Sequence, residues 1–240
     1  MTKFKIIKNS SLALAAATLM LVAPVTTPVS AAPVVVDTIS VSLGPISVAF
    51  SPNGTHAYVT NYNADTVSVI TVATGDVTDT ISVGDYPFSV AFSPNGTHAY
   101  VTNYNADTVS VITVATGDVT DTISVGDAPH SVAFSPNGTH AYVANADIGI
   151  VSVISVATGD VTDTIDVGDF PYSLAFRPNG KKAYVANYYD DTVSVINVAT
   201  STVSRIIRVG NGPISVAFSP NGKKAYVANF FGDTVSVIKN

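Results

Sequence analysis

The feature that most constrains the fold of this chain is an internal repeat. The tetrapeptide Ser-Pro-Asn-Gly begins at positions 51, 93, 135 and 219, and Arg-Pro-Asn-Gly takes its place at 177, so the five copies are evenly spaced. The segment 47–85 returns unchanged at 89–127. Self-similarity at a period of about 40–45 residues is typical of β-propellers, in which one repeat makes one four-stranded blade.

Each repeat contains four runs with the composition of β-strands. In the first unit the runs are SVAF, HAYVTNY, TVSVITVA and VTDTISVG, separated by SPNG, NADT and TGD. Val, Ile, Thr, Tyr and Phe favour strands, and Asn-Gly is a strong signal for a hairpin turn. The chain has no Glu, and all 17 acidic residues are Asp, which favours turns over helices. We therefore expect an all-β fold.

The phase of the repeat predicts how the ring closes. Residues 34–41 read as an isolated fourth strand, and four complete blades follow. The last repeat supplies only three strands. We expect 34–41 to pair with the C-terminal blade, which closes a five-bladed propeller and leaves no exposed sheet edge between the ends. The predicted blades are 45–86, 87–128, 129–170, 171–212 and 213–240 plus 34–41.

The segment 1–31 has the pattern of a secretory signal peptide. Lys3, Lys5 and Lys8 precede an apolar run, and small residues follow it up to Ala31. A retained membrane anchor is the alternative, but the run is shorter than the ~20 residues that a spanning helix needs. We expect a single domain over 32–240, with no membrane span after cleavage. The predicted location is outside the cell or at its surface, or the periplasm where the source has an outer membrane.

One motif in the second strand of each repeat carries a family resemblance. It reads AYVTN at 57–61 and 99–103, and AYVAN at 141–145, 183–187 and 225–229. Together with SVAFSPNG and TVSVI, it resembles the YVTN family of β-propeller repeats over essentially all of 32–240. The resemblance implies a propeller from the group that includes surface-layer proteins and lactonase-like propellers. Members of that family often have seven blades, whereas this chain has five units.

Most of the variation between repeats falls in loops that a propeller gathers at one mouth of its central channel. The predicted ligand-binding residues there are mainly aromatic, and such rings can stack on sugars or hold a peptide. The alternative is that they pack between blades and seal the loops. The set comprises Tyr62, Tyr86, Phe88, Tyr104, His130, Phe170, Tyr172, Tyr188, Tyr189, Phe230 and Phe231.

The residue types available for catalysis are few. The chain has no Cys and no Glu, and His130 is the only His outside the repeated Thr-His-Ala-Tyr motif. A broken ring of Asp85, Asp127 and Asp169 could bind Ca²⁺, but turn capping by Asp explains it as well. We therefore expect no catalytic residues, no metal and no cofactor, and we expect that the protein is not an enzyme.

The net charge limits the kinds of partner that the protein is expected to bind. The net charge of −6 argues against a nucleic-acid partner. Lys181, Lys182, Lys223 and Lys224 are either solvated turns or a basic spot for an anionic polymer. The predicted function is a binding or scaffold propeller that recognises a protein or carbohydrate of the cell envelope. A self-associating surface-layer component and a lactonase-like hydrolase or lyase remain as alternatives, and a monomer is expected although self-association stays open.

Overall fold

The computed structural model describes residues 34–240, and every regular element in this range is a β-strand. Residues 39–240 form one compact unit that contains all of these strands. The predicted signal peptide lies outside the described residues. In the part of the chain that the structure describes, no helix has the length and hydropathy of a membrane span.

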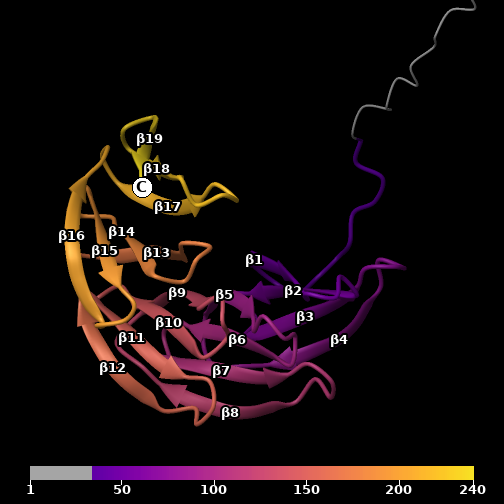
Figure 1. Ribbon diagram of the computed structural model, residues 1–240. Coiled ribbons are helices and arrows are strands. Elements are labelled where there is room, and N and C mark those ends of the chain that lie inside the picture. The colour runs from indigo at the N-terminus through magenta and orange to yellow at the C-terminus, as the bar shows by residue number, and fades with distance from the viewer. Residues whose placement is uncertain (1–33) are drawn as a thin grey trace, which may run out of the picture. The chain divides into compact units, whose positions relative to one another are not determined.

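Five antiparallel sheets follow one another along an arc, and each begins with its innermost strand (Figure 1). The first strands are β1 (Pro45–Phe50), β5 (Pro87–Phe92), β9 (Pro129–Phe134), β13 (Pro171–Phe176) and β17 (Pro213–Phe218). The second strands are β2 (His56–Asn61), β6 (His98–Asn103), β10 (His140–Asn145), β14 (Lys182–Asn187) and β18 (Lys224–Asn229). The third strands are β3 (Thr66–Thr71), β7 (Thr108–Thr113), β11 (Ile150–Ser155), β15 (Thr192–Asn197) and β19 (Thr234–Lys239). The fourth strands are β4 (Val77–Ser82), β8 (Val119–Ser124), β12 (Val161–Asp166) and β16 (Thr202–Arg208).

These sheets are the blades of a propeller, numbered 1 to 5 in chain order, so the predicted fold class is confirmed. The repeated Ser-Pro-Asn-Gly motif makes the turn between the first two strands of each blade. In blade 1 the Ser51 hydroxyl donates to Asn53 Oδ1 at 2.7 Å, and the Gly54 N–H donates to the Ser51 carbonyl at 2.8 Å. Gly54 has a φ of 71°, a left-handed conformation that favours glycine. The motif is therefore explained by local turn chemistry.

The hydrophobic core lies between the blades. Tyr58 and Val67 of blade 1 pack in one buried cluster with Val90 and Val101 of blade 2. The Tyr58 and Phe92 rings meet edge to face with centroids 4.8 Å apart. Equivalent clusters join blades 2 and 3, 3 and 4, and 4 and 5. Each inner sheet is thus covered on both faces by its neighbours, which explains the nearly continuous apolar runs in its strands.

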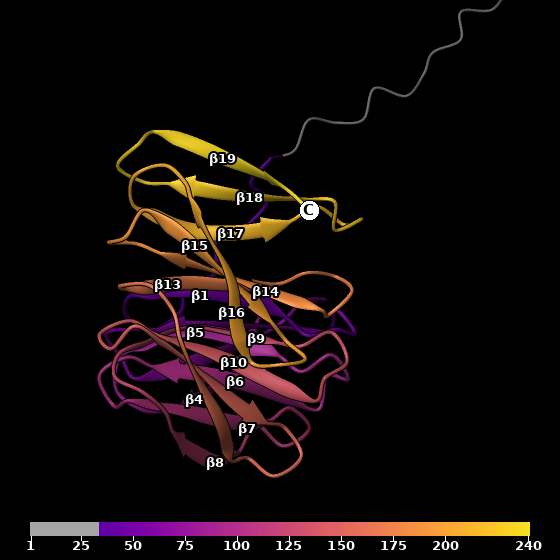
Figure 2. The same ribbon diagram turned by 60° about the vertical axis from the view of Figure 1, so that its left-hand side comes forward.

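The predicted closure of the ring is wrong. Residues 34–40 form no strand, and the last sheet has only the three strands β17, β18 and β19 (Figure 2). Successive inner strands pack on one another from β1 to β17, but no contact of comparable extent joins β17 to β1 within residues 39–240. The four equivalent interfaces impose a similar rotation between neighbouring blades. After four such steps the last blade has not returned to the first.

Candidate ligand-binding site at the mouth of the channel

Each inner strand carries a β-bulge where it enters the sheet. In blade 2, Pro87 pairs with Asn103 and Ser89 pairs with Thr102, so Phe88 is an extra residue without a partner. A bulge bends its strand and redirects the side chain of the extra residue. The same irregularity recurs in every blade, and its extra residues are Ile46, Phe88, His130, Tyr172 and Ile214.

The bulged residues and the serines that follow them line a cavity of about 420 Å³ bounded by all five inner strands. The serines were not among the predicted site residues, although Ser at this place in every repeat was a visible signal. Their hydroxyls can donate and accept hydrogen bonds to a ligand. The lining serines are Ser47, Ser89, Ser131, Ser173 and Ser215.

His130 lies at the centre of the aromatic cluster. Its ring centroid is 4.2 Å from that of Phe88, 4.6 Å from Tyr172 and 5.2 Å from Tyr104. The side chain is only 5% exposed, and within the described structure its buried Nδ1 has no hydrogen-bond partner. Burial lowers the pKa of His130 to about 4, so the imidazole is neutral at pH 7. A neutral imidazole has one nitrogen that donates and one that accepts, so the accessible edge of the ring can take either role toward a ligand without a charge.

Two of the aromatic side chains are held in a strained backbone conformation. Tyr86 directly precedes Pro87 of β5, and Phe170 directly precedes Pro171 of β13. Their φ values are 54° and 52°. Left-handed backbone costs a residue other than glycine roughly 1–2 kcal/mol. The Asp65 carboxylate offsets part of this cost by accepting the Tyr86 N–H at 2.9 Å. Blades 1 and 5 have Gly44 and Gly212 at the same position, and Ala128 of blade 3 has a φ of 55° there, so the left-handed conformation belongs to this position in every blade.

The remaining predicted residues extend the cluster to its rim. Tyr62 lies 4.7 Å from Tyr86, Tyr189 lies 4.9 Å from Phe170, and Phe231 lies 5.6 Å from Tyr188, between ring centroids. Phe230 completes the rim by contacting Phe231 at 5.2 Å. Ring contacts therefore connect all eleven predicted positions. The rings near His130 are buried or half-buried, whereas Tyr189 is 63% exposed. Their role in ligand binding remains a prediction.

The polar surroundings contain no ready-made metal centre in residues 34–240. No three His, Cys, Asp or Glu side chains in this range are placed to hold a metal ion. Asp85, Asp127 and Asp169, which sequence reasoning considered for Ca²⁺, are all exposed. Burial is the largest cause of the raised pKa of Tyr104 and of Tyr172, so both hydroxyls stay protonated well above neutral pH.

The arc of five antiparallel sheets, each with its first strand innermost, defines the chain as a β-propeller. The family model described as "Lactonase, 7-bladed beta-propeller" matches residues 28–171, which is more than half of the chain. The chain therefore belongs to this family. The lactonase-like part of the sequence resemblance is confirmed, while the assignment of the repeats to the YVTN type stays a prediction. No curated protein sequence matches the chain significantly.

Three solved structures illustrate the structural likeness. Hydrazine synthase from Kuenenia stuttgartiensis has a TM-score of 0.74 and 27% identity, over 79% of this chain and 56% of that one. A functionally unknown protein from Desulfotomaculum acetoxidans has a TM-score of 0.72 and 18% identity, over 81% and 68%. A proposed 6-phosphogluconolactonase from Bacteroides uniformis has a TM-score of 0.70 and 21% identity, over 80% and 65%. The chain thus spans 56–68% of the length of these proteins.

The family match corrects one expectation. The scarcity of Glu, Cys and His predicted that the protein is not an enzyme, and membership of a lactonase family contradicts that inference. Scarcity of Glu, Cys and His does not exclude catalysis, because these residue types are not the only ones that can build a catalytic site. A hydrolytic site can also be built from hydroxyls, a neutral imidazole and backbone groups.

Proposed function

We propose that the mouth of the channel binds a small carbohydrate or a sugar-derived ring. The observation that carries the proposal is the set of bulged residues, which places Phe88, His130 and Tyr172 around one cavity. The C–H faces of a sugar stack on aromatic rings, and its hydroxyl groups require the donors and acceptors that the serines and His130 present.

The distribution of burial supports a ligand of modest size. The rings around His130 are half-buried, whereas Tyr86, Tyr189 and Phe231 on the rim are 40%, 63% and 60% exposed. A cavity of about 420 Å³ lies within the range of about 300–1,000 Å³ that is usual for small-molecule sites. A larger glycan would rest on the exposed rim and place one ring in the cavity.

Calorimetric titration with a panel of monosaccharides, disaccharides and aldonolactones tests the binding. Phe88→Ala and Tyr172→Ala should each weaken the best ligand about tenfold or more, because each removes a stacking surface from the cavity. Tyr189→Ala is the matched control, since it removes an exposed ring at the rim, and we expect a change of less than about threefold. Circular dichroism establishes that each variant is folded. Binding of no saccharide by the folded parent, or equal loss in all three variants, would refute the proposal.

Hydrolysis of a sugar lactone is the second candidate, and the family match is the observation that favours it. In the cavity, the neutral imidazole of His130 is the group able to accept a proton from an attacking water. The lining side chains include no carboxylate. A pH-stat assay with aldonolactones, with and without a phosphate group, measures this activity. His130→Gln should reduce hydrolysis while leaving lactone binding measurable, and an unchanged rate would remove His130 from the reaction.

Export to the cell envelope is also part of the proposal. It rests on the leader-like pattern of residues 1–31, which lies outside the described part of the structure. Fractionation of producing cells, followed by N-terminal sequencing, should recover a mature chain that starts near Ala32. An uncleaved chain in the cytoplasmic fraction would contradict export.

A further inference from the structure

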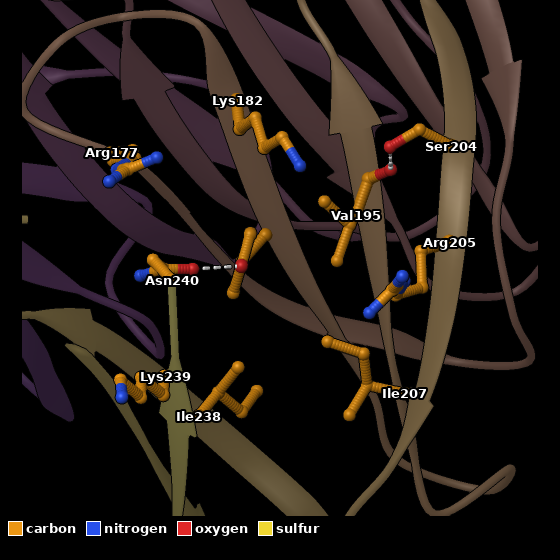
Figure 3. Close-up of a pocket in the computed structure, with 10 residues that line it drawn as sticks. Arg177, Lys182, Val195, Ser204, Arg205, Ile207, Ile238, Lys239 and Asn240 are labelled. Atoms are coloured by element: carbon orange, nitrogen blue, oxygen red, sulfur yellow. Dashed lines mark hydrogen bonds between the residues drawn. The ribbon is translucent and has the colours of Figure 1, made fainter. Parts of the chain in front are cut away.

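A second candidate site lies in the groove between blades 4 and 5. It encloses about 280 Å³, and we call it the basic groove because Arg177, Lys182, Arg205 and Lys239 line it (Figure 3). In Figure 3 the charged ends of Lys182 and Arg205 lie around the same opening. The other lining residues are Tyr184, Val195, Ser204, Ile207, Ile238 and Asn240, so none of the lining side chains is a carboxylate.

The repeat shows that this charge is peculiar to one groove. The corresponding groove between blades 3 and 4 contains Ser135, His140 and Asp163. One repeat further along the chain, the same three positions are occupied by Arg177, Lys182 and Arg205. The groove between blades 1 and 2 has His56 and Asp79 at the second and third of these positions.

The three replacements all act in the same direction. Arg in place of Asp removes one negative charge and adds one positive charge, and Arg in place of Ser and Lys in place of His each put a permanent cation at their position. The altered positions come from the start of the turn after β13, from β14 and from β16, yet all three line one groove. In blades 1 to 3, the same places hold a turn serine, a strand histidine and an exposed aspartate.

Hydrogen bonds hold part of the groove in place. Arg177 Nε donates to the Gly222 carbonyl at 3.0 Å, which leaves the four terminal N–H groups of its guanidinium for another acceptor. Asn240 Nδ2 donates to the same carbonyl at 3.2 Å, and the Tyr184 hydroxyl donates to Asn240 Oδ1. Ser204 donates to the Val195 carbonyl at 3.0 Å. The guanidinium of Arg177 is therefore oriented across the junction of two blades.

Two arginines of the groove act on the same tyrosine. Burial raises the pKa of Tyr184, while the guanidiniums of Arg177 and Arg205 oppose that rise. Both arginines therefore lie within electrostatic range of one phenol. Like charges brought together repel one another, and an anion placed among them offsets that repulsion.

We propose that the basic groove binds an oxyanion of the phosphate or sulfate class. The guanidinium group presents paired N–H donors that match the spacing of two oxygens on such an anion, and a lysine ammonium adds a mobile point charge. The groove is separate from the channel mouth in its residues, so it can be occupied independently of a ligand there. The anion is either free in solution or carried on a polymer, and the chemistry of recognition is the same.

Titration with inorganic pyrophosphate at about 0.15 M ionic strength, where the Debye length is about 8 Å, is the direct test, with heat and ³¹P line width as readouts. Arg205→Asp installs the residue that blades 1 to 3 already carry, so we expect it to fold. It should weaken pyrophosphate binding about tenfold or more, because it removes a guanidinium and adds a carboxylate. The double variant Lys181→Thr, Lys223→Thr is the matched control. It changes the net charge by the same two units at exposed lysines that do not line the groove.

The control should change the affinity by less than about twofold, since surface charges at a distance are screened by salt. Equal weakening in the two variants would show that only net charge matters, and absence of binding to the parent chain would show that the groove takes no such anion. Either result overturns the proposal. A Phe88→Ala chain should bind pyrophosphate like the parent, so failure of the mouth and failure of the groove are distinguishable. Tighter binding of a polyphosphate or sulfated glycan than of pyrophosphate identifies a polymer as the source.

Discussion

The interfaces between blades and the two faces at the ends of the array carry the same residues in different surroundings. Val90, Val132, Leu174 and Val216 of the inner strands are 5–6% exposed, but Val48 at the equivalent place in blade 1 is 61% exposed. At the other end, Tyr226 is 43% exposed, whereas Tyr142 is 1% exposed. Burial in a propeller is therefore a property of the neighbouring blade rather than of the residue.

The two end faces are complementary to one another. The face of blade 1 presents Val48 and Phe50, and the face of blade 5 presents Tyr226, Val235 and Val237, all more than 40% exposed. Their counterparts meet inside the array, for example where Tyr58 and Val67 contact Val90. An apolar surface of this kind is buried when a matching blade face becomes available.

The largest contrast is expected from one tyrosine substitution made at two equivalent places. Tyr142→Ala removes a ring that is 1% exposed and should lower the free energy of unfolding by about 3–5 kcal/mol, as a large cavity in a core does. Tyr226→Ala should cost about 1 kcal/mol or less, because its ring is already partly in solvent. Urea unfolding followed by circular dichroism measures both. Equal losses would mean that the face of blade 5 is covered in solution.

A second comparison concerns the bulged residue of the inner strand. His130, inside the array, is 5% exposed, whereas Ile46, at its end, is 46% exposed. The folded chain protonates His130 near pH 4 and the unfolded chain near pH 6.5, so the unfolded state binds more protons between these values. The free energy of unfolding should therefore fall as pH drops from about 6.5 to about 4, by up to about 3 kcal/mol. Above this window the imidazole has no effect.

Urea unfolding at several pH values, on the parent and on His130→Phe, isolates that contribution. Protonation of the Asp side chains affects both proteins, so the difference between their pH profiles reports on His130. The variant should lose less stability than the parent between pH 6.5 and pH 4. Parallel profiles would show that His130 is reached by water and charges freely in the folded protein.

The open face of blade 1 allows a test of self-association. If the end faces of two copies meet, sedimentation of residues 32–240 should show a mass that increases with concentration. Val48→Asp places a charge on this face and should weaken the association about tenfold or more, equivalent to about 1.4 kcal/mol. Val77→Asp is a control at an exposed valine of the outer strand β4. A parent chain that stays monomeric at every concentration would contradict pairing between copies.

The smallest effect is expected from the segment that the repeat phase predicts to close the ring. Residues 34–40 form no strand, whereas Val41 packs on the buried cluster of Ala57, Val59 and Ile70. Deletion of 34–40 that keeps Val41 should shift the melting temperature by less than about 2 °C. A fall of about 5 °C or more would mean that the segment completes blade 5 in solution, as the sequence predicts.

The sequence predicted most of the fold because its information is local. The even spacing of the repeats, the Asn-Gly turns and the Val- and Thr-rich runs each depend on a few neighbouring residues, and β1 to β19 lie where those runs predict. Closure failed as a prediction because it depends on the rotation between blades. That rotation follows from how side chains such as Tyr58 and Phe92 fit together, which no strand pattern contains. A family with seven blades has a smaller rotation per blade than a closed ring of five requires.

The sequence predicted which aromatic residues form the candidate site but not how they are arranged. Counting the residues that differ between repeats located Phe88, His130 and Tyr172. The bulge that turns them into the channel depends on the register of two strands, which the sequence alone does not show. The serines were overlooked because they do not vary. The basic groove was overlooked because Arg177 follows β13 and Arg205 lies in β16, so the two converge only in the folded blade.

The near identity of the repeats makes the blades interchangeable as genetic units. Blades 1 and 2 share an unbroken identical segment, and the cluster between them has the same residue types as the cluster between blades 2 and 3. Unequal exchange between two copies of such a gene would remove or add one whole repeat. Each remaining interface between blades would keep the same residue types. The number of blades can then change in a single recombination event. Arg177, Lys182 and Arg205 all belong to the repeat that forms blade 4, so they would be inherited together. A lineage of this kind would vary in the number of its blades before it varied in the packing of any blade.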